Sequence, residues 1–364
     1  MIAGFGFVLM CLPAWELPAW SAVPGTKQDT RLDAQLAQIA RSHAGRLTVF
    51  AENLKTGQTA ALDADEPVQT ASVIKLTILL HAAEELRAGR ANLDEKLVLT
   101  KENQAPGSGV LNDLDVPLAL SLRDVLTLMV VLSDNTATNM AIDRFGVRNI
   151  DATIVAAGLK DTWLYKKVFR PATEPMPADQ PKFGLGKTTA REMAAVMTRL
   201  VECRLDLSGG PAKPGDGAIC GAMLTMLRQQ QDRDGLPRYL ETLDTSEQGS
   251  AIGNKTGALD AVRNDVAVIA TKSGPVVIAA FTQENADQRW TGDNEAEKTL
   301  GRVGASVVKA WSPTGLDPSA VNWQNPLRPA PLKPAPLRSA PLRPAPLRPA
   351  PLAAAATSGA TAPQ

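Results

Sequence analysis

The chain has 364 residues, of which 44% are hydrophobic, so it can bury a sizeable core in one large domain or in two interleaved ones. Its 38 basic and 38 acidic residues give a formal net charge of zero, which argues against nucleic acid as the main partner. The stretch from Leu327 onward holds five basic residues and no acid, so the rest of the chain is mildly acidic.

The N-terminus is typical of a secretory signal peptide over residues 1–22, although it has no Lys or Arg before its apolar run. Residues 2–12 are too short to span a bilayer, and Ala19-Trp20-Ser21 offers a cleavage site. We expect export to the periplasm or the extracellular space. Cys11 would leave with the signal. Cys203 and Cys220 would then either pair, contributing roughly 3 kcal/mol, or remain buried free thiols.

Apolar periodicity and turn residues predict helices and strands within one domain over residues 23–312. Helices are expected at 31–43, 72–88, 121–131, 137–145, 189–202, 221–229 and 296–311. Strands are expected at 47–52, 58–62, 262–271 and 275–281, with hairpin turns at Lys55-Thr56-Gly57 and Ser273-Gly274. The order predicts an α/β (α+β) fold, in which an antiparallel sheet flanked by helices is assembled from both ends of the sequence. An all-helical domain, about residues 75–225, is inserted between the two parts of the sheet.

From about Pro313 the chain changes character, and we predict a tail over 313–364 that is disordered or in polyproline II conformation. Residues 327–352 repeat every five residues, and two prolines per repeat exclude helices and sheet ladders. We favour a passive linker over a basic spacer that contacts an anionic envelope surface.

The distribution of histidine excludes two common kinds of catalytic site. The two histidines, His43 and His81, fall in predicted helices, and the chain has no Gly-x-Ser-x-Gly segment, so a Ser-His-Asp hydrolase is not expected. The sequence shows no cluster with metal-ligand spacing. We expect neither a metal nor another cofactor.

A nucleophile that does not need histidine is present in Ser72-Val73-Ile74-Lys75. Ser72 and Lys75 lie one helical turn apart, on the same face of the predicted helix. Lysine can activate a serine hydroxyl when burial or nearby positive charge lowers the pKa of its amine. The pattern recurs at Ser306-Val307-Val308-Lys309, so by itself it is a weak signal.

Two further motifs follow in order. Ser133-Asp134-Asn135 lies in a break between two predicted helices, and Lys255-Thr256-Gly257 comes just before the last pair of predicted strands. Together with Ser72 and Lys75, and with Gly107-Ser108-Gly109-Val110-Leu111, they resemble the motifs of class A β-lactamases and penicillin-recognising serine hydrolases. The resemblance covers roughly residues 31–311 and implies a β-lactamase/transpeptidase-like fold.

The resemblance also implies a role for each matching residue. Ser72 would be acylated, Lys75 would accept or relay its proton, and Ser133 would pass a proton to the leaving nitrogen. Four further residues would bind the substrate: Asn135 its side-chain amide, Lys255 and Thr256 of the Lys-Thr-Gly motif its carboxylate, and Ala258, with the backbone of Ser72, the oxyanion. Gly257 completes the motif.

Two residues remain open. Arg263 is either a second clamp for the carboxylate or a charge on the surface of a strand. Glu174 is either the general base for deacylation or a solvated acid in a loop. Glu174 lies before Thr188-Thr189, as in the family, but Pro177 and Ala178 stand where the family has Leu and Asn.

The function implied is β-lactam hydrolysis by a monomeric, exported enzyme that confers antibiotic resistance. The alternative is a penicillin-binding D-Ala-D-Ala peptidase-like enzyme, or another amide-hydrolysing serine enzyme, with slow deacylation. The substrate would be a small β-lactam or a peptidoglycan-like peptide. A purely structural wall protein built around the tail is disfavoured because all three motifs are intact.

Overall fold

A computed structural model of the protein describes residues 27–173, 175–240 and 250–327. The chain separates into two units, Met1–Arg328 and Pro329–Gln364, and every described residue belongs to the first. The predicted signal peptide at 1–22 and the repeats from residue 328 onward lie outside the described residues and stay predictions.

Most of the described helices come from the middle of the sequence. The helices are α1 Thr30–Arg41, α2 Lys75–Arg87, α3 Leu122–Val131, α4 Asn135–Phe145, α5 Val147–Ala156, α6 Gln180–Phe183, α7 Ala190–Val201, α8 Asp216–Arg228 and α9 Glu295–Trp311, with 3-10 turns η1 Ala71–Ile74, η2 Leu111–Asp113 and η3 Pro318–Ala320. Within the described ranges, no helix combines the length and the apolar character that crossing a bilayer requires.

The main sheet takes its strands from both ends of the chain, as predicted. The strands of the protein are β1 Lys27–Gln28, β2 Arg46–Asn53, β3 Gln58–Leu62, β4 Val68–Gln69, β5 Lys96–Leu99, β6 Leu118–Ser121, β7 Trp163–Leu164, β8 Gly186–Thr188, β9 Ile252–Leu259, β10 Val262–Thr271 and β11 Gly274–Gln283. The main sheet has the order β1-β3-β2-β11-β10-β9, and its neighbours are antiparallel except for β1 and β3. Strand β9 therefore forms one edge of the sheet.

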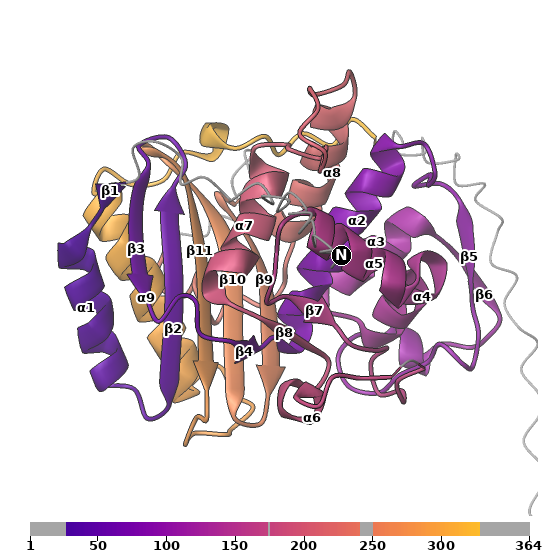
Figure 1. Ribbon diagram of the computed structural model, residues 1–364, viewed down its shortest axis with the longest axis horizontal. Coiled ribbons are helices and arrows are strands. Elements are labelled where there is room, and N and C mark those ends of the chain that lie inside the picture. Colours follow the sequence, from indigo (N-terminus) through magenta and orange to yellow (C-terminus); the bar gives the residue numbers. More distant parts are fainter. Residues whose placement is uncertain (1–26, 174, 241–249, 328–364) are drawn as a thin grey trace, which may run out of the picture. The chain divides into compact units, whose positions relative to one another are not determined.

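Both faces of the sheet are covered, because successive side chains of a strand point to opposite faces. In β10, Ala267 and Ile269 pack with α1 and α9, whereas Val266 and Val268 pack with the helices inserted between β3 and β9. Figure 1 shows α1 and α9 together beyond one face of the sheet, and α7 and α8 beyond the other. The expected α+β fold, with helices on both sides of an antiparallel sheet, is confirmed.

Side-chain caps explain where several helices begin. Ser121 accepts a hydrogen bond from Asp124 N and forms a capping box at the start of α3, and Thr189 accepts one from Glu192 N before α7. The predicted helices are confirmed, with shifts of up to five residues at their ends. The inserted domain is not all-helical as predicted, because β5, β6, β7 and β8 lie within residues 75–225. Helix α5 was not predicted, because Gly146 separates it from α4 by a single residue.

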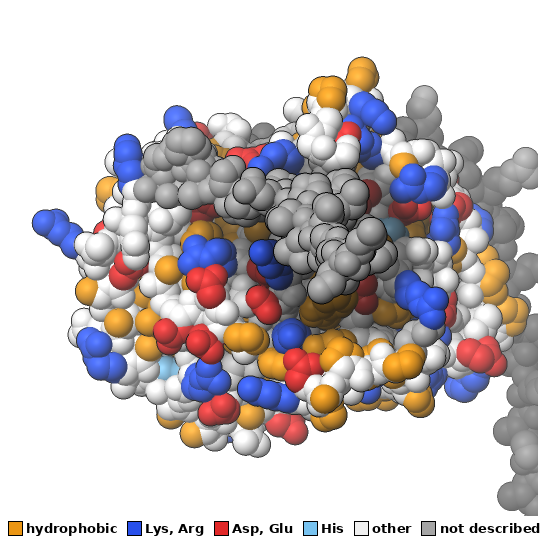
Figure 2. All heavy atoms as spheres, in the orientation of Figure 1, with side chains coloured by type: hydrophobic (Ala, Val, Ile, Leu, Met, Phe, Trp, Pro, Cys, Tyr) orange, Lys and Arg blue, Asp and Glu red, His pale blue; other side chains and the backbone are white. Residues whose placement is uncertain are grey.

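Side chains on the face shown in Figure 2 are not distributed evenly by type. Acidic and basic side chains are interspersed there, and hydrophobic ones gather over α6 and the loops beside it. Helix α6 belongs to the segment that leads from β7 to β8, so this apolar part of the surface lies over that segment.

The ordered body extends past Pro313, so the prediction of an extended tail is wrong for residues 313–327. Val321 is buried, and Thr225 Oγ1 donates a 2.7 Å hydrogen bond to Trp323 O. A Cβ at Gly253 of β9 would lie 3.1 Å from the Trp323 ring. The apolar side chains that precede the repeats give this segment enough burial to hold it on α8 and β9.

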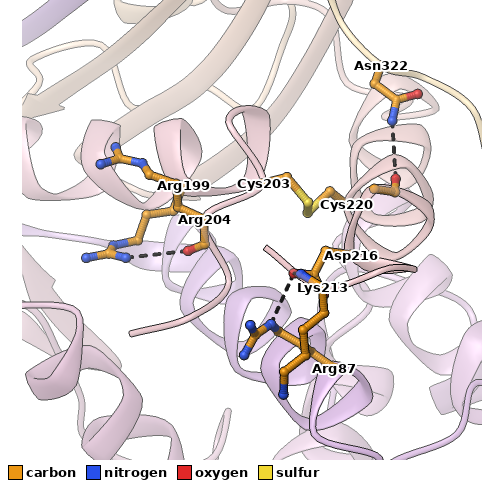
Figure 3. Close-up of a disulfide and its surroundings, with 9 residues drawn as sticks. Arg87, Arg199, Cys203, Arg204, Lys213, Asp216, Cys220 and Asn322 are labelled. Atoms are coloured by element: carbon orange, nitrogen blue, oxygen red, sulfur yellow. Dashed lines mark hydrogen bonds and ion pairs between the residues drawn. A yellow bond between two sulfur atoms is a disulfide. The ribbon is translucent and has the colours of Figure 1, made fainter. Parts of the chain in front are cut away.

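Cys203 and Cys220 form a disulfide, which settles the pairing that the sequence left open. It joins Cys203, two residues after the end of α7, to Cys220 in the first half of α8 (Figure 3). Nearby, Arg87 Nε of α2 donates a 3.1 Å hydrogen bond to Asp216 Oδ2 at the start of α8. Three helices of the inserted domain are thereby connected at one end.

Candidate active site

The candidate nucleophile, Ser72, lies in η1, directly before α2. The preceding residue, Ala71, has a φ of 45°, which is uncommon outside glycine. Strand β9 runs close to this turn, since a Cβ at Gly257 would be 3.0 Å from Ser72 N and 2.9 Å from Val73 N. Only a glycine at position 257 lets the edge strand approach Ser72 so closely.

Lys75 is fully buried one turn after Ser72. In the described part of the chain, its ammonium nitrogen donates to Ser133 O at 2.6 Å, Ser133 Oγ at 3.1 Å and Asn135 Oδ1 at 3.1 Å, rather than to Ser72 Oγ. Burial, and then the charge of Lys255, hold the pKa of Lys75 well below its usual value, although Asp134 opposes the shift. A lysine of this kind can act as a base near neutral pH.

Ser133 stands between the two buried lysines. It lies in the break between α3 and α4, as predicted, with a φ of 54°. Its Oγ accepts a 3.0 Å hydrogen bond from Lys255 Nζ in addition to the bond from Lys75. Burial lowers the pKa of Lys255 to about 8, against the opposing charges of Asp232 and Asp265. A hydroxyl between two amines is well placed to carry a proton.

The Lys-Thr-Gly motif lies just before the strand pair β10 and β11, as predicted. It also lies in a strand that was not predicted, because Lys255, Thr256, Gly257 and Ala258 all fall within β9. No sequence signal marks β9, because its residues do not alternate between apolar and polar, and six of its eight residues are buried. The motif is therefore held rigidly beside η1 by pairing with β10.

The Asp134 carboxylate accepts hydrogen bonds from backbone N–H groups on both sides of the Ser-Asp-Asn motif. Its Oδ1 accepts from Ala137 N at the start of α4, and its Oδ2 accepts from Val110 N at 2.7 Å and Leu111 N at 2.9 Å. Gly109, with a φ of 105°, passes so close that a Cβ would be 2.2 Å from this carboxylate. The segment 107–111 is thereby fixed against the Ser-Asp-Asn motif.

Two amide side chains that the sequence gave no reason to select hold the strand before Ser72. Asn264 Nδ2 donates to Gln69 O at 2.9 Å and to Thr70 O at 3.2 Å. Gln283 Oε1 accepts from Gln69 N at 3.3 Å. Both residues lie on central strands, and their place could have been inferred only from the register of β10 and β11.

Arg263 does not join the other predicted site residues. It pairs in register with Ala258, but its side chain lies on the α9 side of the sheet, where its Nε is 3.4 Å from Glu297 Oε1. Its Nη2 donates to Arg289 O at 2.9 Å, and its guanidinium stacks on the Trp290 ring. In this structure Arg263 neither joins the other predicted site residues nor lies as a charge on the surface of a strand, because its side chain is buried on the face of the sheet opposite Lys255.

Buried acids lie on that opposite face, behind the Lys-Thr-Gly motif. Asp265 Oδ2 accepts from Leu236 N at 2.9 Å, and its two oxygens accept from Asn254 Nδ2. Burial raises the pKa of Asp265 to about 7 and that of Glu297 to about 8, and in Glu297 the neighbouring Asp232 and Asp265 add to the rise. These groups hold protons near neutral pH instead of forming a cluster of full charges.

Asn139 is a further residue that sequence reasoning missed. It lies on α4 four positions after Asn135, and its Oδ1 accepts from Val168 N at 2.8 Å while its Nδ2 donates to Val168 O at 3.1 Å. The spacing of four along one helix face was a usable signal. Glu174, farther along the same loop, lies outside the described residues, and its role stays a prediction.

A model of the beta-lactamase enzyme family matches residues 31–311 of the chain. The chain belongs to this family. It is therefore a hydrolase of the beta-lactamase family, in agreement with the resemblance that its motifs indicated. β-Lactam hydrolysis is the activity that this membership supports.

Individual members of the beta-lactamase family align over most of their length. A beta-lactamase of Streptomyces fradiae is 25% identical over 325 residues, which cover 85% of this chain and 94% of that protein. The crystal structure of a beta-lactamase from Sphaerobacter thermophilus is 30% identical, with a TM-score of 0.64, and covers 78% of this chain and 97% of its own.

Two further solved structures share the fold at lower identity. PBP-A is 23% identical, with a TM-score of 0.64, over 79% of this chain and 98% of that chain. An ancestral class A beta-lactamase is 23% identical, with a TM-score of 0.63, over 77% and 99%. At this identity both likenesses support the β-lactamase/transpeptidase-like fold alone.

Proposed function

We propose that this beta-lactamase family member attacks the carbonyl carbon of a β-lactam through Ser72 and forms an acyl-enzyme. The observation that carries the proposal is the position of Ser133 Oγ, which hydrogen-bonds to the amines of both Lys75 and Lys255 at the site of Ser72. No hydrolytic role in this arrangement requires a histidine, a metal or another cofactor.

The proton of the Ser72 hydroxyl passes to Lys75 as the new O–C bond forms. When the C–N bond of the lactam breaks, Ser133 donates its proton to the leaving nitrogen and is reprotonated by Lys75. The lowered pKa of Lys75 supports the first transfer, and its 3.1 Å bond to Ser133 Oγ supports the second. Atoms and charges balance without a further reactant.

The substrate would be held by the rest of the motifs. Lys255 and Thr256 bind its carboxylate, and Asn135 binds the amide of its acyl side chain. The close approach of Gly257 to Ser72 N supports an oxyanion hole formed by the N–H groups of Ser72 and Ala258. We propose no substrate contact for Arg263, since its side chain faces α9.

Hydrolysis of the acyl-enzyme requires a base for the attacking water, and Glu174 is the residue we propose. The second candidate function is a penicillin-binding, D-Ala-D-Ala peptidase-like enzyme that deacylates slowly after β-lactams. It is favoured by the loop itself: residues 165–173 contain no carboxylate, and Asn139 fixes Val168, an apolar residue, beside the Asn135 end of α4.

Mass spectrometry of the purified protein with a penicillin, alongside turnover of a chromogenic cephalosporin, distinguishes the two candidates. Steady turnover with little adduct supports a β-lactamase in the narrow sense. A stable adduct on Ser72 without turnover supports the second candidate. The absence of any adduct and any turnover would contradict both.

We also propose that the enzyme is exported and acts as a monomer. The disulfide Cys203–Cys220 supports export, because such bonds persist mainly in oxidising compartments. Sequencing the N-terminus of the mature protein tests export, with a start at or next to Ala22 expected. Retention of Met1 together with free thiols at both cysteines would contradict it.

A further inference from the structure

Phe169 is held in an unfavourable conformation on the surface of the loop between β7 and β8. Its φ is 52°, in the left-handed region that bulky residues rarely occupy, and its side chain is 63% exposed. A large aromatic side chain gains nothing from the core in this position. Such strain, where it persists, is often retained at functional sites.

Both neighbours of Phe169 are anchored, so the strain cannot relax. Val168 is fixed through its N–H and its carbonyl by the side chain of Asn139. Arg170 Nη2 donates to Glu102 O at 3.0 Å and to Gln104 O at 2.7 Å. The ring is therefore presented from a loop that α4 and the segment 102–104 hold in place.

The ring borders the candidate active site at Asn135. A Cβ at Gly107 would be 3.6 Å from Phe169 Cε2 and 3.0 Å from Asn135 Nδ2, so the ring edge and the amide are within contact reach of the same point. Asn135 in turn accepts a hydrogen bond from Lys75. Val110, which lies in the segment 107–111 with Gly107, is 45% exposed, and its N–H donates to Asp134.

We propose that Phe169 determines specificity by packing against an aromatic or flat apolar group on the acyl side chain of the substrate. This rests on the proposed function of Ser72 and Asn135. With Asn135 binding the side-chain amide, the group beyond that amide would reach the exposed ring, and each ring would remove apolar surface of the other from water. The preferred substrates are thus amides whose acyl side chain ends in an aromatic group.

The test compares two acyl donors with the same bicyclic nucleus and carboxylate. Benzylpenicillin carries a phenylacetyl side chain, and aminopenicillanic acid carries none. Second-order rate constants for adduct formation on Ser72 are measured by mass spectrometry with the full-length protein. We expect Phe169→Ala to lower the constant for benzylpenicillin about tenfold, and that for aminopenicillanic acid less than about twofold.

Two further variants separate loss of the ring from release of strain. Phe169→Gly, which suits the positive φ, should match Phe169→Ala, and Phe169→Tyr should retain the preference for benzylpenicillin. Tyr239→Ala is the matched control, because Tyr239 is also a largely exposed aromatic but packs at Gly301 of α9. Thermal unfolding of each variant verifies that it folds.

Equal losses for both compounds in Phe169→Ala and Phe169→Gly would overturn the inference in favour of a purely structural role in the loop. Unchanged constants for both compounds would overturn it as well. In either case adducts still form, and the proposed function stands. The absence of both adduct and turnover with either compound in the unsubstituted protein would overturn the proposed function, and this inference with it.

Discussion

The two sides of the candidate site are built in different ways. On the side of the two lysines, Lys75, Ser133 and Lys255 are connected by hydrogen bonds, and both lysine side chains are fully buried. On the side of the loop between β7 and β8, the contacts are backbone clamps such as that of Asn139 on Val168, and Phe169 is exposed. The first side is preorganised for one reaction, whereas the second can vary with the substrate.

The largest effect is expected at the lysine side, from Ser72→Ala. Loss of the nucleophile should lower covalent labelling by a penicillin by roughly 10⁴-fold or more, because no other group replaces the attacking oxygen. Labelling is measured by intact-protein mass spectrometry. The second Ser-x-x-Lys copy supplies the control, since Ser306→Ala on α9 should label normally. Normal labelling of Ser72→Ala would contradict the assignment of the nucleophile.

Lys255 should give the next largest effect, and it carries a pH signature. Its pKa of about 8 means that its positive charge is lost as the pH rises through that value, so acylation should decline above about pH 8. Lys255→Ala should lower acylation roughly 10²–10³-fold at pH 7, as expected for loss of a charged donor. Stopped-flow measurements of acylation across pH 6–10 test both statements.

Lys255→Arg sharpens this comparison. Arginine stays protonated throughout the range, so the alkaline decline should move to higher pH even if the rate falls. Lys55→Arg, in the Lys-Thr-Gly copy between β2 and β3, should leave the profile unchanged. If acylation by Lys255→Arg still declines above about pH 8, a group other than Lys255 titrates at that pH.

The loop side is tested by Glu174→Gln. If Glu174 is the base for deacylation, acylation should be retained while turnover of a chromogenic cephalosporin falls about 10²-fold and the acyl-enzyme accumulates. Asp179→Asn, five residues farther along the chain, is the control, because Asp179 pairs with Lys187. Unchanged turnover would remove Glu174 from the mechanism and favour the slow-deacylation alternative.

The smallest effect is expected for Glu297 of α9, and it concerns the free energy of unfolding. The pKa of Glu297 is raised to about 8, so the folded state binds a proton that the unfolded state has released above about pH 4.5. This stabilising contribution is present below about pH 4.5 and is lost as the pH rises through about 8. Glu297→Gln should therefore reduce the decline in the free energy of unfolding between pH 5 and 8 by about 3 kcal/mol.

Urea denaturation at several pH values measures this difference. Glu284→Gln is the control, since Glu284 is exposed and pairs only loosely with Arg46, at 3.6 Å. Asp265, with a pKa of about 7, titrates in the same window and should leave part of the decline in Glu297→Gln. Identical pH dependence in Glu297→Gln and the unsubstituted protein would show that Glu297 is ionised at neutral pH.

The order of the main helices and the residues of the three motifs could be predicted from local patterns in the sequence. The three motifs follow one another in one order, and apolar periodicity and capping residues such as Ser121 mark the helices. These are local signals, because a helix face, a cap or a turn depends on residues only a few positions apart. The sheet assembled from both chain ends followed from the same order of elements.

Which side chains contact one another followed only from the three-dimensional structure. It placed Lys255 inside an edge strand, turned Arg263 to the face of α9, and brought Asn264 to the backbone before Ser72. It also paired Cys203 with Cys220 and extended the body to residue 327. The physical reason is register: a shift of one residue along a strand reverses every side chain, and only long-range pairing fixes it.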